Sequence, residues 1–217
     1  MRKAVITGIS KSRGRITDID PDLQHNAIVE LAGGLEPEGL ISGFTLHAEG
    51  LLQVGVDDFR DALRIAMLFK TAVNRVATFE SGKKRGEKVR FDLLLSIGVG
   101  VVVPGEAPLA RKSLPAVLSR RGLSHIQATD QTIGIFTGVE TTDHYYETLL
   151  YLYGGIMDHW SLSAAELVHL KLWGLTEQEI ANELGISQPA VNQRSQSAFW
   201  KGLERILAAY QELEQKI

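Results

Sequence analysis

A short segment near the carboxyl end, residues 174–191 (GLTEQEIANELGISQPAV), constrains the fold of this chain most strongly. Thr176 and Glu179 have the spacing of a capping box, in which the threonine oxygen accepts the N3 amide while the glutamate accepts the N-cap amide. Gly185 supplies the positive φ that a tight turn between two helices requires. Ser187 is followed two residues later by a proline, which the first turn of a helix tolerates. The segment therefore predicts two short helices joined by a tight turn.

A further helix is expected directly before this pair. Ser163 and Glu166 form a second capping-box pattern, and Gly174 is placed to end the helix. Ala181 is small, as the contact between two steeply crossing helices requires. Together these features predict a helix-turn-helix at residues 163–200.

The second helix of such a unit presents its N-terminal and outward side chains to base edges in the major groove. The candidate DNA-binding residues are Thr176, Ser187, Gln188, Asn192, Gln193, Arg194 and Gln196. Amide side chains can bind adenine with two hydrogen bonds and arginine can do so with guanine, while helix N-termini offer amides to phosphate. A solvated helix face is the alternative, but Lys and Glu would be more typical of one.

The charge distribution argues against tight binding by one copy. Residues 1–140 carry 18 Lys and Arg against 16 Asp and Glu, whereas residues 141–217 carry five against ten. Few bases mean weak DNA binding with a shallow salt dependence, because affinity comes mostly from neutralised phosphates. Glu177, Glu179 and Glu183 are compatible with DNA only if they point away from it or lie close to the helix start. We expect a homodimer, which would double the contacts.

The first 140 residues alternate strand-like and helix-like segments and predict an α+β domain. The expected elements are a strand at Ala4–Thr7, a hairpin of Phe44–His47 and Leu51–Val54, a helix over Asp57–Phe79, a strand at Phe91–Val103, a short helix near 110–121, and strands at Ser124–Ala128 and Thr132–Thr137. Gly98 and Gly100 indicate a close backbone approach or a bulge.

Residues 141–217 have a helical period and predict an all-α domain that follows a boundary near residue 140. A helix is expected over Asp143–His159, in which Gly154 and Gly155 mark a kink, a break or a tight crossing. The third helix of the helix-turn-helix is expected to run on past residue 200. Its apolar stripe, from Phe199 to Tyr210, would cover the first domain, the 143–158 helix or a second subunit.

The helix-turn-helix resembles that of sigma-factor region 4 and related bacterial regulators. The matching residues are LSxxE at 162–166, GLTEQEIANELGIS at 174–187 and AVNQR at 190–194. The chain as a whole resembles the SatD family of bacterial proteins. That resemblance rests on AVITGxxxSR at 4–13, LQ at 23–24, FTLHAEGLLQ at 44–53, FRDALRIAMLFKTAVNR at 59–75, LSIGVG at 95–100 and VNQRSQSAFWKGLE at 191–204.

The family resemblance implies a ferredoxin-like, nucleotidyl-cyclase-type palm followed by a helix-turn-helix. In such palms a carboxylate after the first strand and another in the central hairpin hold metal for phosphoryl chemistry. Here Ile9 stands at the first place, and the hairpin offers Ala48 followed by Glu49. One carboxylate cannot bridge two metals, so we expect a non-catalytic domain with no catalytic residue, metal or cofactor. Asp57 and Asp92 are further acids with ordinary structural explanations.

Several classes of protein are disfavoured by composition. No apolar run approaches the ~18–20 residues of a membrane span, and the residues before Gly8 are too few for a signal-peptide core. The chain has no cysteine, and its six histidines show no metal-ligand spacing. These features favour the cytoplasm of a microbe.

The residues leave three functions open. The first is a DNA-binding transcriptional regulator whose N-terminal domain dimerises or senses a ligand. The second is a nucleotide-binding or nucleotidyl-transfer enzyme relic with a regulatory helical domain, and the third is a protein-interaction module. Lys11, Arg13, Arg15 and residues 83–85 could attract an anionic small molecule or nucleotide as an effector, although a solvated basic loop is the more ordinary explanation of these side chains.

Overall fold

The computed structural model of the protein describes residues 1–13, 21–47, 49–79 and 88–213, which form a mixed sheet covered by helices. The strands are β1 (Arg2–Arg13), β2 (Gly43–Leu46), β3 (Leu51–Val56), β4 (Ala77–Phe79), β5 (Lys88–Val101) and β6 (Ile133–Phe136). Their order is β2-β3-β1-β5-β4, and β6 also pairs with β5. The α+β class predicted from the sequence is confirmed.

The first part of the sheet has a split β-α-β order. Strand β1 lies antiparallel between β3 and β5, and β2 forms the expected hairpin with β3. Helix α1 (Pro21–Leu35) connects β1 to β2. A 3-10 turn (Phe59–Asp61), helix α2 (Ala62–Asn74) and β4 connect β3 to β5. Strand β6 is parallel to β5 and extends the sheet beyond this unit.

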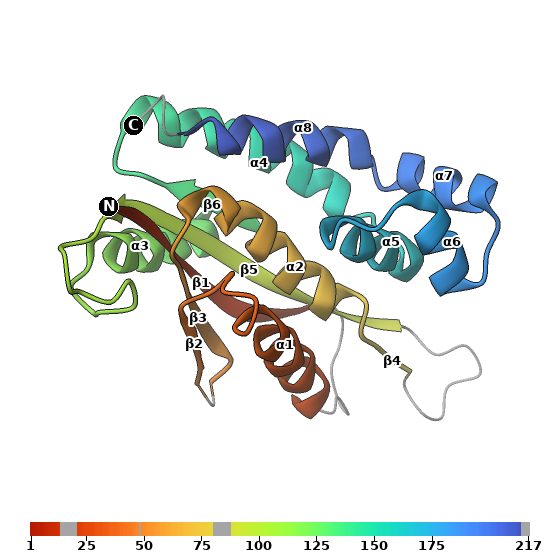
Figure 1. Ribbon diagram of the computed structural model, residues 1–217, viewed down its shortest axis with the longest axis horizontal. Coiled ribbons are helices and arrows are strands. Elements are labelled where there is room, and N and C mark those ends of the chain that lie inside the picture. Colours follow the sequence, from red (N-terminus) through yellow and green to blue (C-terminus); the bar gives the residue numbers. More distant parts are fainter. Residues whose placement is uncertain (14–20, 48, 80–87, 214–217) are drawn as a thin grey trace.

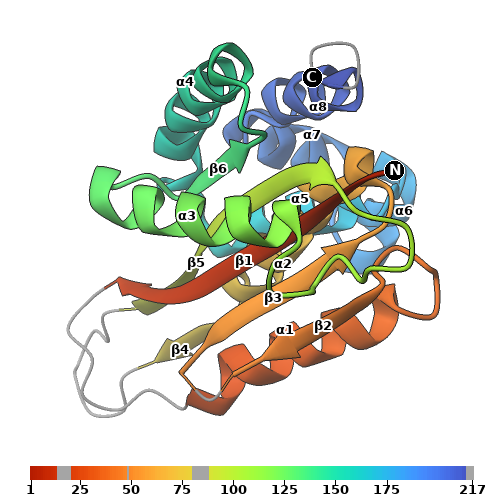
Figure 2. The same cartoon turned by 90° about the vertical axis from the view of Figure 1, so that its left-hand side faces the viewer.

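Helices cover both faces of the sheet, with α1 and α2 on one face and α3 (Leu114–Thr129) on the other (Figure 2). Strand β1 alternates accordingly: Ile6 lies in the core with α1 and α2, whereas the hydroxyl of Thr7 lies 2.8 Å from that of Ser119 in α3. Helix α3 comes so close to β5 that a Cβ on Gly98 would lie 2.1 Å from the carbonyl oxygen of Pro115. Gly98 therefore marks a close backbone approach.

The helices after residue 139 are α4 (Glu140–Met157), α5 (Leu162–Leu172), α6 (Glu177–Leu184), α7 (Gln188–Ser197) and α8 (Trp200–Gln211). Helices α4 and α8 run side by side, and α5 to α7 gather at one end (Figure 1). One apolar core extends from the sheet into α4, α5 and α8. Tyr210 of α8 donates to the carbonyl of Phe59 at 2.9 Å, and Tyr146 of α4 donates to that of Ala209 at 2.9 Å. Helix α8 thus packs against both α4 and the 3-10 turn that follows β3.

The sequence-based assignment of residues 110–137 is partly wrong, because residues 124–128 lie in α3 and are not a strand. The side of α3 that faces the sheet carries the small residues Ser119 and Gly122, which hide the helical period. Thr132–Thr137 does contain the expected strand, β6.

Two predicted helices differ from the structure, and of the roles considered for Gly154 and Gly155 the break is excluded. The helix predicted over 57–79 ends at Asn74, and the apolar residues after it form the short strand β4. Helix α4 continues through Gly154 and Gly155 without a break. The long third helix is instead divided into α7 and α8 at Phe199, which has a left-handed φ of 52°. No helix in the described part of the chain is long and apolar enough to cross a membrane.

Candidate nucleic-acid interface

Helix α5 attaches α6 and α7 to the rest of the protein. One of its faces buries Ala164, Ala165 and Val168 in the main core beside α2. The other face buries Leu167 in a separate small core with Ile180 and Ala181 of α6 and Val191 of α7. Helices α6 and α7 are therefore held by packing against α5, as Figure 1 shows at the end of the molecule.

The capping box at the start of α6 is present as predicted. Glu179 Oε2 accepts the Thr176 backbone N–H at 2.8 Å, and Thr176 Oγ1 accepts the Glu179 N–H at 3.3 Å. The hydrogen bonds from the side chain and backbone of Thr176 lower the pKa of Glu179. Gly185 ends α6 with a φ of 62°, as expected for the tight turn.

The expected capping box at the start of α5 is wrong by two residues. Ser161 is the N-cap and accepts the Ala164 N–H at 3.1 Å, while its hydroxyl lies 2.9 Å from that of Ser163. The earlier serine takes this role because Leu162 already has helical conformation. Helix α5 therefore begins before Ser163.

Helix α7 is the most exposed element of this unit. Of its ten residues only Val191 is buried. Ser187 precedes it as N-cap but makes no side-chain capping bond within the described structure. Six of the candidate DNA-binding residues are exposed and Arg194 is half-buried; the six are Thr176, Ser187, Gln188, Asn192, Gln193 and Gln196.

Two contacts organise the amide side chains on this surface. Gln188 Nε2 donates to Gln178 Oε1 of α6 at 2.8 Å, and Gln196 Nε2 donates to Asn192 Oδ1 at 3.4 Å. Both contacts are exposed to solvent, so base edges can compete for these groups. The arrangement forms a row of hydrogen-bonding groups on one side of α7.

Arg194 points back to α5. Its guanidinium Nη1 lies 3.4 Å from Glu166 Oε2, and the two side chains are 28% and 44% exposed. The expected position of Arg194 near phosphate would require this contact to break.

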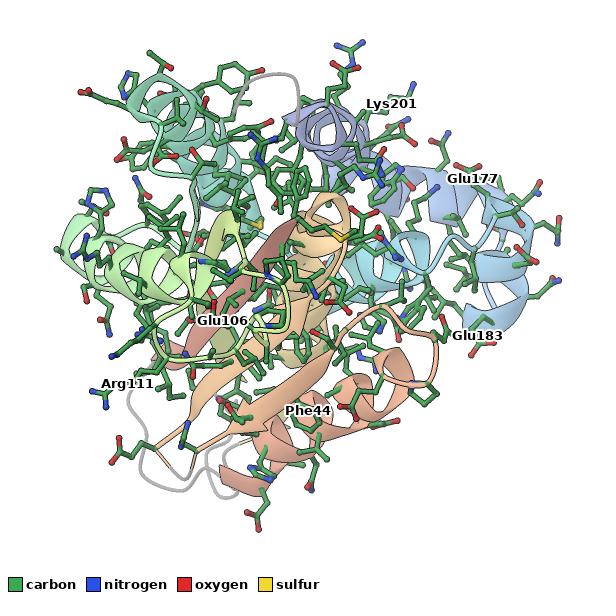
Figure 3. The ribbon with its side chains drawn as sticks, turned by 60° about the vertical axis from the view of Figure 1, so that its left-hand side comes forward. Phe44, Glu106, Arg111, Glu177, Glu183 and Lys201 are labelled. Carbon is green, nitrogen blue, oxygen red and sulfur yellow. The ribbon has the colours of Figure 1, made fainter. Side chains whose placement is uncertain are left out.

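The acidic residues of α6 occupy its start and its outer side. Glu177 lies 3.5 Å from Lys171, and Glu179 belongs to the capping box. Glu177 and Glu183 point outward from the molecule (Figure 3). Two of the three acids therefore satisfy the condition of lying near the helix start, and Glu183 in the last turn does not.

A buried histidine that the sequence did not single out links α5 to α2. His169 Nδ1 lies 2.9 Å from Thr71 Oγ1, and His169 Nε2 accepts the indole N–H of Trp173 at 3.1 Å. Burial lowers the pKa of His169 to about 4, and the nearby charge of Arg75 acts in the same direction. The ring is thus neutral at pH 7. Its two hydrogen bonds hold α5, against which α6 and α7 pack, in a fixed position on α2.

A buried ion pair lies close to the same junction. Lys70 Nζ lies 2.5 Å from Asp92 Oδ1 and donates to the carbonyl of Leu93 at 3.0 Å. Asn74 Nδ2 donates to the same Asp92 oxygen at 3.1 Å. Asp92 therefore has a structural role at the contact of α2 with β5, and Asp57 pairs with Lys3 at the surface.

The place where a palm would hold its first carboxylate is apolar. Ile9 packs with Leu94, Leu123 and Ile126 beneath α3. Ala48, the second expected departure, lies outside the described residues. No group of three or more His, Cys, Asp or Glu side chains in the described ranges is placed to hold a metal ion.

The chain matches no protein-family model, no curated protein and no solved structure.

A pocket of about 460 Å³ lies between α3, β6 and α4, with ionisable side chains in a wall that is otherwise largely apolar. Glu147 in its wall lies 3.1 Å from His125 Nε2 and 3.7 Å from His144 Nδ1. The hydrogen bond from His125 is the main cause that lowers the pKa of Glu147. The sequence could have indicated the contact of His144 with Glu147, because residues three apart lie on the same side of a helix. It gave no indication of His125, which belongs to another helix. Of the basic groups expected to attract an anion, Lys11 pairs with Asp130, while Arg15 and residues 83–85 lie outside the described ranges.

Proposed function

We propose that this chain is a DNA-binding transcriptional regulator that places α7 in the major groove. The observation that carries the proposal is the exposure of α7, which buries one side chain out of ten. A surface helix ordinarily buries a wide apolar stripe. Helix α7 contacts the rest of the protein mainly through Val191, and α5, which supports it, is packed into the main core. Most of the surface of α7 is therefore available to another molecule.

The side chains on α7 favour DNA as that molecule. Gln188, Asn192, Gln193 and Gln196 are exposed amides, and α7 contains no carboxylate. Amides can donate and accept at once, as recognition of adenine in the major groove requires. The N-terminus of α7 also presents backbone amides, beside an exposed Ser187, to a phosphate.

The regulator would bind DNA through few ionic contacts. Arg194 is paired with Glu166, and Lys171 is paired with Glu177. Each neutralised phosphate contributes to the salt dependence of binding, so few free cations mean a shallow dependence. Specificity would come from the amide row more than from charge.

The N-terminal part with the sheet would be a ferredoxin-like, palm-like domain that has no catalytic activity. The apolar surroundings of the half-buried Ile9 support this role, because a carboxylate at this place would lie against the apolar side chains of Leu94, Leu123 and Ile126. The domain would dimerise or bind an effector, and the pocket beside Glu147 is the candidate effector site. We place the regulator in the bacterial cytoplasm.

Fluorescence anisotropy with a duplex that the wild type enriches from a randomised pool, measured at about 50 mM salt, tests the proposal. The double variant Asn192→Ala/Gln193→Ala should weaken binding about tenfold, since one bidentate base contact contributes roughly 1–3 kcal/mol. Gln127→Ala, which removes an exposed amide from α3, is the matched control and should leave binding unchanged. Equal affinity of the double variant and the wild type would refute α7 as the reader.

A basic protein surface is the second candidate partner. This partner is favoured by two acidic side chains that point outward, Glu177 and Glu183 (Figure 3). It is also favoured by the pairing of Arg194 with Glu166, which leaves this surface with less positive charge. If no duplex binds at about 50 mM salt, Glu177→Gln/Glu183→Gln should abolish capture of a polylysine probe. Unchanged capture would exclude this face as the docking site.

A further inference from the structure

Helix α4 carries two stripes on different sides. The buried stripe packs into the core through Thr142, Tyr146, Leu150, Tyr153 and Met157. A second stripe, which we call the outer seam, consists of Thr141, Tyr145, Thr148, Leu152 and Gly155, and every one of these residues is exposed. The steps along the outer seam are four, three, four and three residues, the spacing at which helices pack in coiled coils.

The composition of the outer seam is unlike that of a solvated helix face. It contains no Asp, Glu, Lys or Arg, although such residues make up 23% of the chain. Leu152 is 65% exposed and Tyr145 is 44% exposed. Figure 2 shows α4 at the outside of the molecule, next to α8 and beyond β6. Two large, exposed side chains one heptad apart on an uncharged stripe are the arrangement of a helix contact surface.

Large and small residues alternate along the outer seam, and this alternation identifies the occupant. If a second α4 lies antiparallel, with the two-fold axis midway between Thr148 and Leu152, then Tyr145 faces Gly155 and Thr148 faces Leu152 of the other copy. Each large side chain then meets a small one, as interdigitating layers require. A parallel pair would place tyrosine against tyrosine and glycine against glycine.

We propose that the outer seam binds a second copy of this chain in this antiparallel arrangement. Gly155 leaves room for a tyrosine ring, because no described atom lies within 4 Å of the place where its Cβ would be. The interface is isologous, so the uncharged outer seam meets its own uncharged equivalent.

A hollow beside the outer seam supports the same occupant. It has a volume of about 280 Å³, and Leu152 and Gly155 of the outer seam lie in its wall. Tyr145 of the second copy would enter over Gly155 and fill part of this hollow.

The dimer is argued without reference to DNA binding, but it would also explain how the proposed regulator binds its site. Two copies joined through α4 would present two α7 helices related by two-fold symmetry, as the halves of a palindromic site require. The second copy also doubles the limited number of phosphate contacts.

Sedimentation equilibrium of the full chain tests the interface. Tyr145→Ala removes the large side chain and Gly155→Tyr fills the hollow, so each single variant should weaken dimerisation at least about tenfold. The double variant exchanges the large and small positions and should restore the dimer. Ala208→Tyr, at an exposed position on α8, is the control and should dimerise like the wild type.

Three results would overturn the proposal: a monomeric wild type, dimers that persist in both single variants, or a double variant that fails to recover. Thermal melts of the variants establish that each is folded. Anisotropy with duplex DNA separates this proposal from the preceding one. A monomer that binds DNA through Asn192 and Gln193 refutes only the interface, whereas a dimer without DNA affinity refutes only the regulator.

Discussion

The indole N–H of Trp173 donates a hydrogen bond of 3.1 Å to Nε2 of His169. Nε2 must therefore carry a lone pair, and the ring proton resides on Nδ1, which lies 2.9 Å from Thr71 Oγ1. Protonation of Nε2 would break the bond to Trp173 within a buried site. The neutral imidazole thus joins α5, against which α6 and α7 pack, to α2.

The state of His169 predicts how stability depends on pH. In the unfolded chain its pKa is close to 6.5, and in the folded chain burial lowers the pKa to about 4. The unfolded state therefore takes up a proton first as the pH falls, and the stabilisation present above pH 6.5 is lost between pH 6.5 and pH 4. The loss amounts to roughly 3 kcal/mol at most.

Urea unfolding of the wild type and His169→Gln at pH 7.5 and pH 4.5 measures this effect. The stability advantage of the wild type should shrink at the lower pH, because only the wild type carries the titrating ring. An equal advantage at both pH values would contradict the assignment of a neutral, buried His169.

The buried Lys70–Asp92 pair should respond unequally to single and double substitution. Lys70→Met removes the buried ammonium that lies 2.5 Å from Asp92 Oδ1 and should destabilise the fold by roughly 3–5 kcal/mol, because removing one partner of a buried ion pair is strongly destabilising. Lys70→Met/Asp92→Asn also removes the buried negative charge and should recover part of that loss. Chemical denaturation of the two variants decides the matter, and a double variant less stable than Lys70→Met would refute the assigned role.

Local chemistry made helix α6 and the turn after it predictable, because Thr176, Glu179 and Gly185 each act within a few residues of their own position. Helix α3 was harder to recognise, since its packing face relies on Gly122, whose partners Phe136 and Ser96 are distant in sequence. The apolar periodicity also gave no sign that α7 and α8 are separate helices, because a phenylalanine seldom adopts the positive φ found at Phe199.

Within the candidate interface, side-chain pairing was less predictable than position. The exposure of Gln193 followed from helical periodicity, whereas the contact of Arg194 with Glu166 depends on how α7 lies against α5. The same holds for His169, whose partner Thr71 is 98 residues away in the chain.

Backbone conformation, not space, should decide the response of Gly185 to substitution. A Cβ would meet no described atom within 4 Å at either Gly185 or Gly33, but only Gly185 has a positive φ. Gly185→Ala should therefore cost about 1 kcal/mol or more. Gly33→Ala, in the interior of α1, should stabilise the protein by up to about 1 kcal/mol. Equal effects of the two variants in thermal unfolding would contradict the left-handed turn.

Releasing Arg194 should strengthen DNA binding. Glu166→Gln removes its carboxylate partner while keeping the side-chain shape, so Arg194 becomes available to a phosphate. The slope of log affinity against log salt should become steeper by up to about 0.9. Glu204→Gln on α8 changes the net charge equally and serves as the control. Salt titrations in which both variants change alike would show that Arg194 does not act at the interface.

Selection of duplexes from a randomised pool by the full-length chain at about 50 mM salt tests the central claim most directly. If α7 reads bases through its amides, the wild type enriches a defined sequence motif, and Asn192→Ala/Gln193→Ala loses the preference at adenine positions within it. A wild type that enriches no motif, or a variant that enriches the same motif with equal strength, would contradict the account.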